Sequence, residues 1–166
     1  LYAWHVRDRV QQLAALFYSG SAIGAVFAGD LITLFFYWEG TAIASVFLIW
    51  ARGTIGAYNA GLRYLIIQVM SGVILLSGAA LLWLETGSLA FDKMTLGSLG
   101  TWLIFISFGM KSAFPLMHNW LQDSYPSATV TGTVILSAFT TKLAVYALAR
   151  GFAGTEILIY IGAIMT

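Results

Sequence analysis

Residues 97–122 read GSLGTWLIFISFGMKSAFPLMHNWLQ, a run of 26 residues in which Lys111 is the only formally charged side chain. A helix of about 20 apolar residues crosses the hydrocarbon core of a bilayer, so this run is long enough to span a membrane. Gly109 and Pro115 flank the lysine. Proline removes a backbone donor and clashes with the preceding helical turn, so a helix kinks or breaks there. We therefore predict a membrane span that is interrupted between about Lys111 and Leu116.

Similar charge-poor windows recur along the chain and predict an all-α integral membrane protein, a multi-helix bundle with one discontinuous transmembrane helix. The expected spans are about 10–29, 31–50, 62–84, 97–122, 129–150 and 156–166. The last run covers only about 16 Å as a helix, roughly half of the hydrocarbon core. We expect five complete spans and a truncated sixth, in a single transmembrane region that is an internal stretch of a larger subunit.

The composition supports this fold class. Lys and Arg number 8 and Asp and Glu number 7, so 9% of the 166 residues are charged and 60% are hydrophobic. Ordinary soluble domains carry about 25% charged residues, and the mean hydropathy of +0.86 is far from theirs. These values exclude a soluble enzyme, and the net charge of +1 argues against binding to nucleic acid. We expect no catalytic residues, no cofactor and no metal.

Three ionisable residues lie inside the expected spans: Glu39, Lys111 and Lys142. Each costs about 2.5–3.5 kcal/mol at a helix centre, so they point to a function. Burial disfavours a charged lysine and a nearby carboxylate favours it, so a lysine between these influences can load and release a proton. We predict a proton or ion path in which Glu39 and Lys111 form the functional couple. The alternative is a buried ion pair that only fixes packing.

Further polar residues have two interpretations each. His118, two helical turns beyond the central lysine, is equally consistent with a proton relay and with a hydrogen bond that serves packing. Arg63 at the start of the third span is an anchor at the membrane surface or a partner of Glu39. We expect Asp30 to cap the second helix. We expect Asp123 to cap the loop that follows the fourth span.

Three motifs resemble one family. Gly109-Met110-Lys111, followed by His118-x-Trp120-Leu121-x-Asp123, resembles the G-I-K…P-L-H-x-W-L-P-D-A-H signature of the antiporter-like subunits of respiratory complex I and Mrp-type cation/proton antiporters. Phe36-Tyr37-Trp38-Glu39 is similar to that family's F-x-W-E, and residues 141–148 are similar to its T-K-V-G-V-Y-A-L. In this chain Pro115 lies one place early, Gln122 replaces the motif proline and Tyr125 replaces its second histidine.

The resemblance implies a subunit of roughly fourteen helices, of which this chain is about helices four to nine. It implies that Glu39 is the ion-pair glutamate, Lys111 the central lysine on the discontinuous helix and Lys142 the connecting lysine. Arg63 stands where many members carry a lysine. The departures from the motif bear on the local shape of the helix break and on a histidine relay near Tyr125.

The resemblance also predicts the function. We expect a proton-translocating membrane subunit, favouring a multisubunit Na⁺/H⁺ antiporter because the region around 151–156 resembles its D-type subunit. The first alternative is a proton-pumping subunit of complex I or a related hydrogenase, and the second is a scaffold that transports nothing. The expected partners are other subunits of the complex, protons, Na⁺ in the antiporter case, and the lipid bilayer. The expected location is the bacterial inner membrane or an equivalent energy-transducing membrane.

Overall fold

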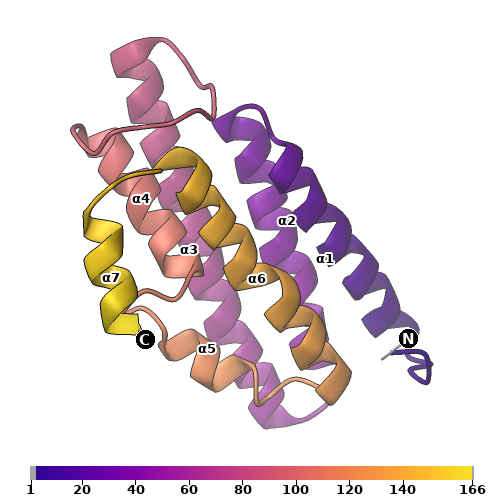
Figure 1. The fold of residues 1–166 in the computed structure, drawn as a ribbon. Helices are drawn as coiled ribbons and strands as arrows, with labels where there is room; N and C mark the ends of the chain where they lie inside the picture. Colours follow the sequence, from indigo (N-terminus) through magenta and orange to yellow (C-terminus); the bar gives the residue numbers. More distant parts are fainter. Residues whose placement is uncertain (1–2, 166) are drawn as a thin grey trace.

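The fold is all-helical. A computed structural model describes residues 3–165, and within that range the chain forms seven α-helices and no strand (Figure 1). The helices are α1 (Arg9–Phe27), α2 (Leu31–Trp50), α3 (Ile55–Thr86), α4 (Leu99–Lys111), α5 (Asn119–Ser124), α6 (Val130–Gly151) and α7 (Ile157–Met165).

Polar side chains fix where most of the helices begin. Asp8, Asp30, Thr54, Ser98 and Thr129 immediately precede α1, α2, α3, α4 and α6, and each accepts a hydrogen bond from a backbone N–H of the first turn. Such a cap satisfies one of the donors that a helix start leaves without a partner. The expected role of Asp30 is thereby confirmed.

Two helix bounds differ from the spans expected from the sequence. α3 begins at Ile55, seven residues before the expected start at 62, because Thr54 caps it and the helix continues through Arg63. Charge-free windows locate the apolar part of a helix and miss such extensions. α4 has only 13 residues and ends at Lys111, and helical structure resumes in α5 at Asn119. Residues 97–122 therefore do not form one unbroken helix. That α4 and α5 together make a single interrupted membrane span stays a prediction.

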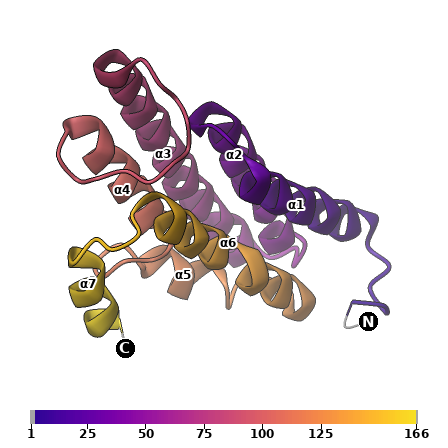
Figure 2. The ribbon, with the colours of Figure 1, turned by 45° about the horizontal axis from the view of Figure 1, so that its top comes forward.

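The helices pack as a bundle of roughly parallel and antiparallel rods (Figure 1). Consecutive helices from α1 to α4 pack on one another, and α6 lies against α1, α2 and α4. The short α5 packs on α3, and α7 lies at the opposite side of the bundle from the N-terminus (Figure 2). By length and composition, α1, α2, α3 and α6 are the helices in the described range that can cross a membrane.

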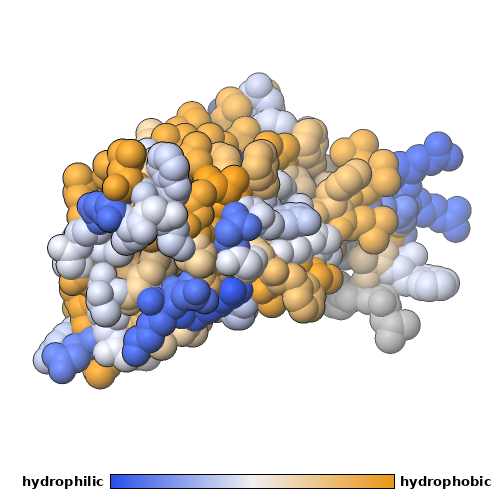
Figure 3. Space-filling model, turned by 90° about the horizontal axis from the view of Figure 1, so that it is seen from above, coloured by the Kyte–Doolittle hydropathy of each residue, from blue (hydrophilic) through white to orange (hydrophobic). Residues whose placement is uncertain are grey.

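Large hydrophobic side chains remain exposed around the bundle, among them Phe17, Phe27 and Leu84. Hydrophobic residues cover much of the surface in Figure 3, with hydrophilic residues in separate patches. A surface of this kind suits lipid contact. Inside the bundle, Trp38 of α2 packs on Phe108 of α4, with ring centroids 5.2 Å apart, and both side chains are fully buried.

The helices α3 and α4 cross at very short range, at Gly78 and Gly100. A methyl group at Gly78 would lie 2.8 Å from the carbonyl oxygen of Gly100 and 2.9 Å from the backbone nitrogen of Ile104. Because backbone atoms cannot swing away, any side chain at Gly78 must push the two helices apart. The glycine pair therefore sets the distance between α3 and α4.

We expect Gly78→Val to destabilise the protein by about 1–3 kcal/mol, the usual cost of overpacking a tight core. The measurement is the thermal unfolding of the purified full-length subunit in detergent. Gly56→Val is the matched control, because Gly56 also lies in α3 and a methyl group there meets nothing within 4 Å. Equal melting temperatures for the two variants would contradict the prediction.

Candidate functional site

The centre of the candidate site is Lys111, the last residue of α4, whose side chain is 0% exposed. Its ammonium donates hydrogen bonds of 2.8 Å to the carbonyl oxygen of Trp38 and to the hydroxyl of Thr41. It also lies 4.3 Å from the centroid of the Trp38 ring, as a cation–π contact. The buried charge is thus held by neutral groups of α2.

The Trp38 side chain is itself fixed by a chain of hydrogen bonds between helices. Its indole N–H donates to the Ser71 hydroxyl at 3.1 Å, and Ser71 donates to the backbone carbonyl of Gln68 at 2.7 Å. Ser107 of α4 donates to the backbone carbonyl of Ser71 at 2.6 Å. These bonds tie α2, α3 and α4 together beside Lys111 and hold the tryptophan ring in place.

Glu39 lies next to this centre but makes no direct ion pair with Lys111 within 4.0 Å in the described part of the chain. The two side chains do interact electrostatically. The Glu39 carboxylate rests against Gly72 of α3, where a methyl group would overlap it. Its buried Oε1 has no hydrogen-bond partner among residues 3–165. The expected proximity of Glu39 and Lys111 is present, whereas direct pairing is replaced by the bonds of the lysine to α2.

Sequence reasoning missed Gln68 of α3. Its side chain is 1% exposed, and neither the amide oxygen nor the amide nitrogen has a hydrogen-bond partner in the described range. Leaving such a group unpaired costs about 1–3 kcal/mol. The signal was present, because Gln68 is the only side-chain amide in the window 64–84. Sequence reasoning also missed the buried hydroxyls of Tyr18, Tyr64 and Thr140.

The helix break after Lys111 places the lysine at the end of α4. Ala113 and Leu116 have φ angles of 62° and 69°, in the left-handed region that non-glycine residues seldom adopt. The Phe114 ring folds back over Gly109, where a methyl group would collide with it. A helix that continued to Pro115 would drive the proline ring against the carbonyl of Lys111, so the helix ends there. Gly109 lies in the last turn of α4 and Pro115 in the segment between α4 and α5, and their role in a break within one membrane span stays a prediction.

Arg63 and Asp123 form the one ion pair among residues 3–165, with Nη2 and Oδ2 2.5 Å apart. Arg63 therefore does not pair with Glu39, its alternative interpretation, and the Asp123 carboxylate binds the arginine rather than capping its own loop. The interpretation of Arg63 as an anchor at the membrane surface stays a prediction. Arg63 lies nine residues before Gly72 on α3, which is about 13 Å along the helix. Sequence spacing could not reveal the contact, since it joins α3 to the end of α5.

We expect Arg63→Gln to change the stability by less than about 1 kcal/mol and transport by less than about twofold. The Arg63 and Asp123 side chains are 58% and 44% exposed, and exposed pairs contribute little. Thermal unfolding and vesicle transport of the intact complex provide the measurements, with Arg9→Gln as a second exposed arginine. A larger loss of transport would place Arg63 on the proton path.

Lys142 and His118 lie apart from this centre. Lys142 is exposed on α6 and lines a hollow of about 180 Å³ between α1 and α6, together with Ala22, Ile23, Val26, Phe139, Leu143 and Tyr146. His118 precedes α5, is partly buried, and its side chain makes no hydrogen bond within the described residues. Neither residue is brought against Lys111, so their roles in a proton path stay predictions.

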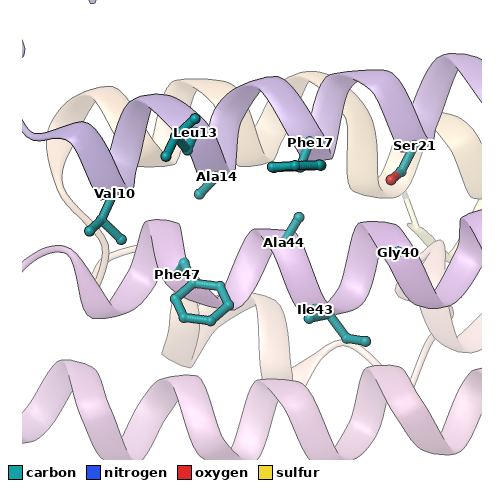
Figure 4. A pocket seen from close by; sticks show the side chains of 9 residues that line it. All are labelled: Val10, Leu13, Ala14, Phe17, Ser21, Gly40, Ile43, Ala44 and Phe47. Atoms are coloured by element: carbon teal, nitrogen blue, oxygen red, sulfur yellow. The ribbon is translucent and has the colours of Figure 1, made fainter.

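A groove between α1 and α2 carries no ionisable side chain and differs from the site in kind. It has a volume of about 430 Å³ and lies between the two helices, whose side chains line it from both sides (Figure 4). Its lining residues are Val10, Leu13, Ala14, Phe17, Ser21, Gly40, Ile43, Ala44 and Phe47. Ser21 is the one polar side chain of this lining, so the groove differs from the polar surroundings of Lys111.

Residues 28–164 match the family model described as NADH:quinone oxidoreductase/Mrp antiporter, TM. The D-type subunit of the Na(+)/H(+) antiporter of Bacillus subtilis (strain 168) is 28% identical over 139 residues, which cover 78% of this chain and 28% of that protein. The N-type subunit of the NADH-quinone oxidoreductase of Deinococcus radiodurans is 31% identical over 140 residues, covering 77% and 28% respectively. A chain of respiratory complex I from Thermus thermophilus has a TM-score of 0.80 and 25% identity, covering 95% of this chain and 37% of that chain.

Proposed function

This chain belongs to the NADH:quinone oxidoreductase/Mrp antiporter transmembrane family, and from that premise we propose that it carries protons through Lys111 as part of an antiporter-like subunit. It is a multi-pass membrane protein of this type. The chain spans 28% of the length of each of the two curated relatives described above, so the activity, substrates and partners of the whole protein belong to the proposal.

One observation carries the proposal: Lys111 is fully buried, next to Glu39, and bound by neutral acceptors. A direct buried salt bridge would hold both charges in place and resist separation. A lysine that binds only a carbonyl and a hydroxyl lacks that restraint. It can give up its proton while Trp38 and Thr41 keep the neutral amine in position, so a change in the distance to Glu39 suffices to load or release the proton.

The finer proposal is a subunit of a multisubunit Na⁺/H⁺ antiporter. The similarity to the D-type antiporter subunit of Bacillus subtilis supports it. The second candidate is a proton-pumping subunit of an NADH:quinone oxidoreductase, which the 31% identity to the Deinococcus radiodurans protein and the fold of the complex I chain favour. In both cases the partners are the other subunits of a multisubunit membrane complex, in the bacterial inner membrane or an equivalent membrane.

The test uses inverted membrane vesicles that hold the complete complex. Vesicles are first acidified inside by an unrelated proton pump, and Na⁺ is then added. Release of the pH gradient by Na⁺ supports the antiporter, whereas a gradient that forms only when NADH is oxidised through the complex supports the second candidate. If neither assay detects proton movement, both candidate functions are contradicted, and the remaining alternative is a scaffold that transports nothing.

A further inference from the structure

Buried hydroxyls from four parts of the chain meet on one turn of α6. Tyr18 of α1 and Tyr125, which follows α5, both donate to the carbonyl oxygen of Leu136, at 3.2 and 3.1 Å. Thr140, one turn further along α6, hydrogen-bonds Tyr18 and also interacts with Tyr64 of α3. We call Tyr18, Tyr64, Tyr125 and Thr140 the hydroxyl cluster.

One end of the hydroxyl cluster reaches an open hollow. Tyr125 lines a hollow of about 650 Å³ at the end of the bundle where α2 ends and α6 begins. Five of its nine lining residues are polar, namely Arg52, Tyr125, Thr129, Thr133 and Ser137. Polar groups in a space of this size hold water. The cluster therefore meets water directly at this end, through Tyr125.

The other end of the cluster points towards Lys111. Tyr64 hydrogen-bonds the Ser45 hydroxyl at 2.8 Å, and Ser45 lies one helical turn after Thr41, the acceptor of the Lys111 ammonium. Gln68 covers this turn from α3, because it lies one turn after Tyr64 and helical side chains lean towards the N-terminus of their helix. Neither the nitrogen nor the oxygen of its amide has a hydrogen-bond partner among residues 3–165.

The order of contacts along the helices supports this placement. Trp38 of α2 bonds Ser71 of α3, and Ser45 of α2 bonds Tyr64, so the two helices run antiparallel. Gln68 lies between Tyr64 and Ser71 and therefore at the level of Thr41. An amide with free donors and a free acceptor at this level can hold a water molecule between Thr41 and Ser45.

We propose that Gln68 and the hydroxyl cluster form the path along which Lys111 exchanges its proton with water at the Arg52 end of the bundle. The inference rests on the proposed function and adds the route and its direction. At each step a hydroxyl or water oxygen accepts one proton and donates its own to the next oxygen. For this step Tyr125 turns its O–H from the carbonyl of Leu136, which cannot pass a proton on, to the hydroxyl of Thr140, with which it also interacts. No group on the path gains an atom or a net charge, and the exchange leaves only Lys111 and the water in the hollow changed.

The titratable groups that face the path are Glu39 from α2, Lys111 from α4, Tyr18 from α1, Tyr64 on α3 and Tyr125 after α5.

The amide and the hydroxyls are positioning residues, since they act through the proton of Lys111. Their removal should slow proton exchange without loss of the fold, because valine and phenylalanine keep the shape of threonine and tyrosine.

The test is Thr140→Val in the complete complex, assayed for proton transport in inverted vesicles. We expect transport at least about tenfold slower, with a larger solvent deuterium isotope effect because proton transfer becomes limiting. Thr140→Ser, which keeps the hydroxyl, should transport at nearly the unmodified rate. Thr131→Val is the matched control, because Thr131 is also a buried threonine of α6 but accepts its hydrogen bond from Gln11, outside the cluster.

Normal transport by Thr140→Val beside an inactive Lys111→Ala would overturn the path and leave the proposed function standing. Normal transport by Lys111→Ala would overturn the proposed function itself. Equal losses in Thr140→Val and Thr140→Ser would also overturn the path, since they would reveal a need for threonine's shape. If Thr140→Val fails to accumulate in the membrane, Tyr125→Phe decides by the same rate and isotope criteria.

Discussion

Lys111→Ala is expected to lower proton transport by at least about a hundredfold, the scale on which a single proton-transferring group acts. Alanine removes the only charged side chain of α4, and with it the ammonium group that donates hydrogen bonds to Trp38 and Thr41. The subunit should still accumulate and assemble, because Lys111 makes no direct ion pair within 4.0 Å among the described residues and alanine brings no new polar group into the core. The measurement is the initial rate of proton movement in inverted vesicles that contain equal amounts of the subunit, in whichever of the two assays described above the unmodified complex is active.

Two variants sharpen this result. Lys111→Arg should also be inactive, because a guanidinium group keeps its proton at any accessible pH. Lys93→Ala is the matched control, since Lys93 is exposed in the loop between α3 and α4 and contacts neither Glu39 nor the hydroxyl cluster. Transport near the unmodified level in Lys111→Ala would end the mechanism, and equal losses in both alanine variants would point to assembly instead.

Glu39→Gln is expected to slow transport about tenfold or more while leaving assembly intact. Glutamine has the same shape as glutamate but removes the negative charge that interacts with Lys111. A tenfold change corresponds to about 1.4 kcal/mol of differential interaction between the protonated and neutral lysine. The amide should fit the site, because Oε1 of Glu39 has no hydrogen-bond partner to lose among the described residues.

The measurement is again the rate of proton transport at matched amounts of subunit in the membrane. Glu85→Gln provides the control, because Glu85 is an exposed carboxylate at the end of α3. If the two glutamine variants transport equally well, Glu39 has no part in loading Lys111. If Glu39→Gln is absent from the membrane, its charge serves folding and the prediction fails.

Hydrophobic windows and intramembrane charges predict most of the architecture. They predict the all-helical bundle, which is confirmed, and they draw attention to Glu39 and Lys111, which the structure brings close together. Spacing along one helix does not fix how that helix is rotated against its neighbours. For that reason the bonds of Lys111 to α2, the outward position of Lys142 and the contact of Arg63 with Asp123 could not be foreseen.

The hydroxyl cluster escaped the sequence for another reason. A serine or threonine in a helix can donate its hydroxyl to a backbone carbonyl of the preceding turn, as Ser77 does to Val73, and a tyrosine can find a partner on any neighbouring helix. A single hydroxyl therefore carries no information about its partners. Only the folded arrangement reveals that the hydroxyls of Tyr18 and Tyr125 contact the turn of α6 that contains Leu136 and Thr140.

The shortness of α4 has a consequence for how the protein enters its membrane. As a helix of 13 residues it covers about 20 Å, less than the roughly 30 Å of the hydrocarbon core, and it carries a lysine at its end. Such a segment is a poor signal for insertion by itself. The 32-residue α3 precedes it and packs on it at Gly78 and Gly100, so we expect the two to insert together as a helical hairpin. Trp38 and Thr41 leave the ribosome before Lys111, so the acceptors for the charge are already in the bilayer when the lysine arrives.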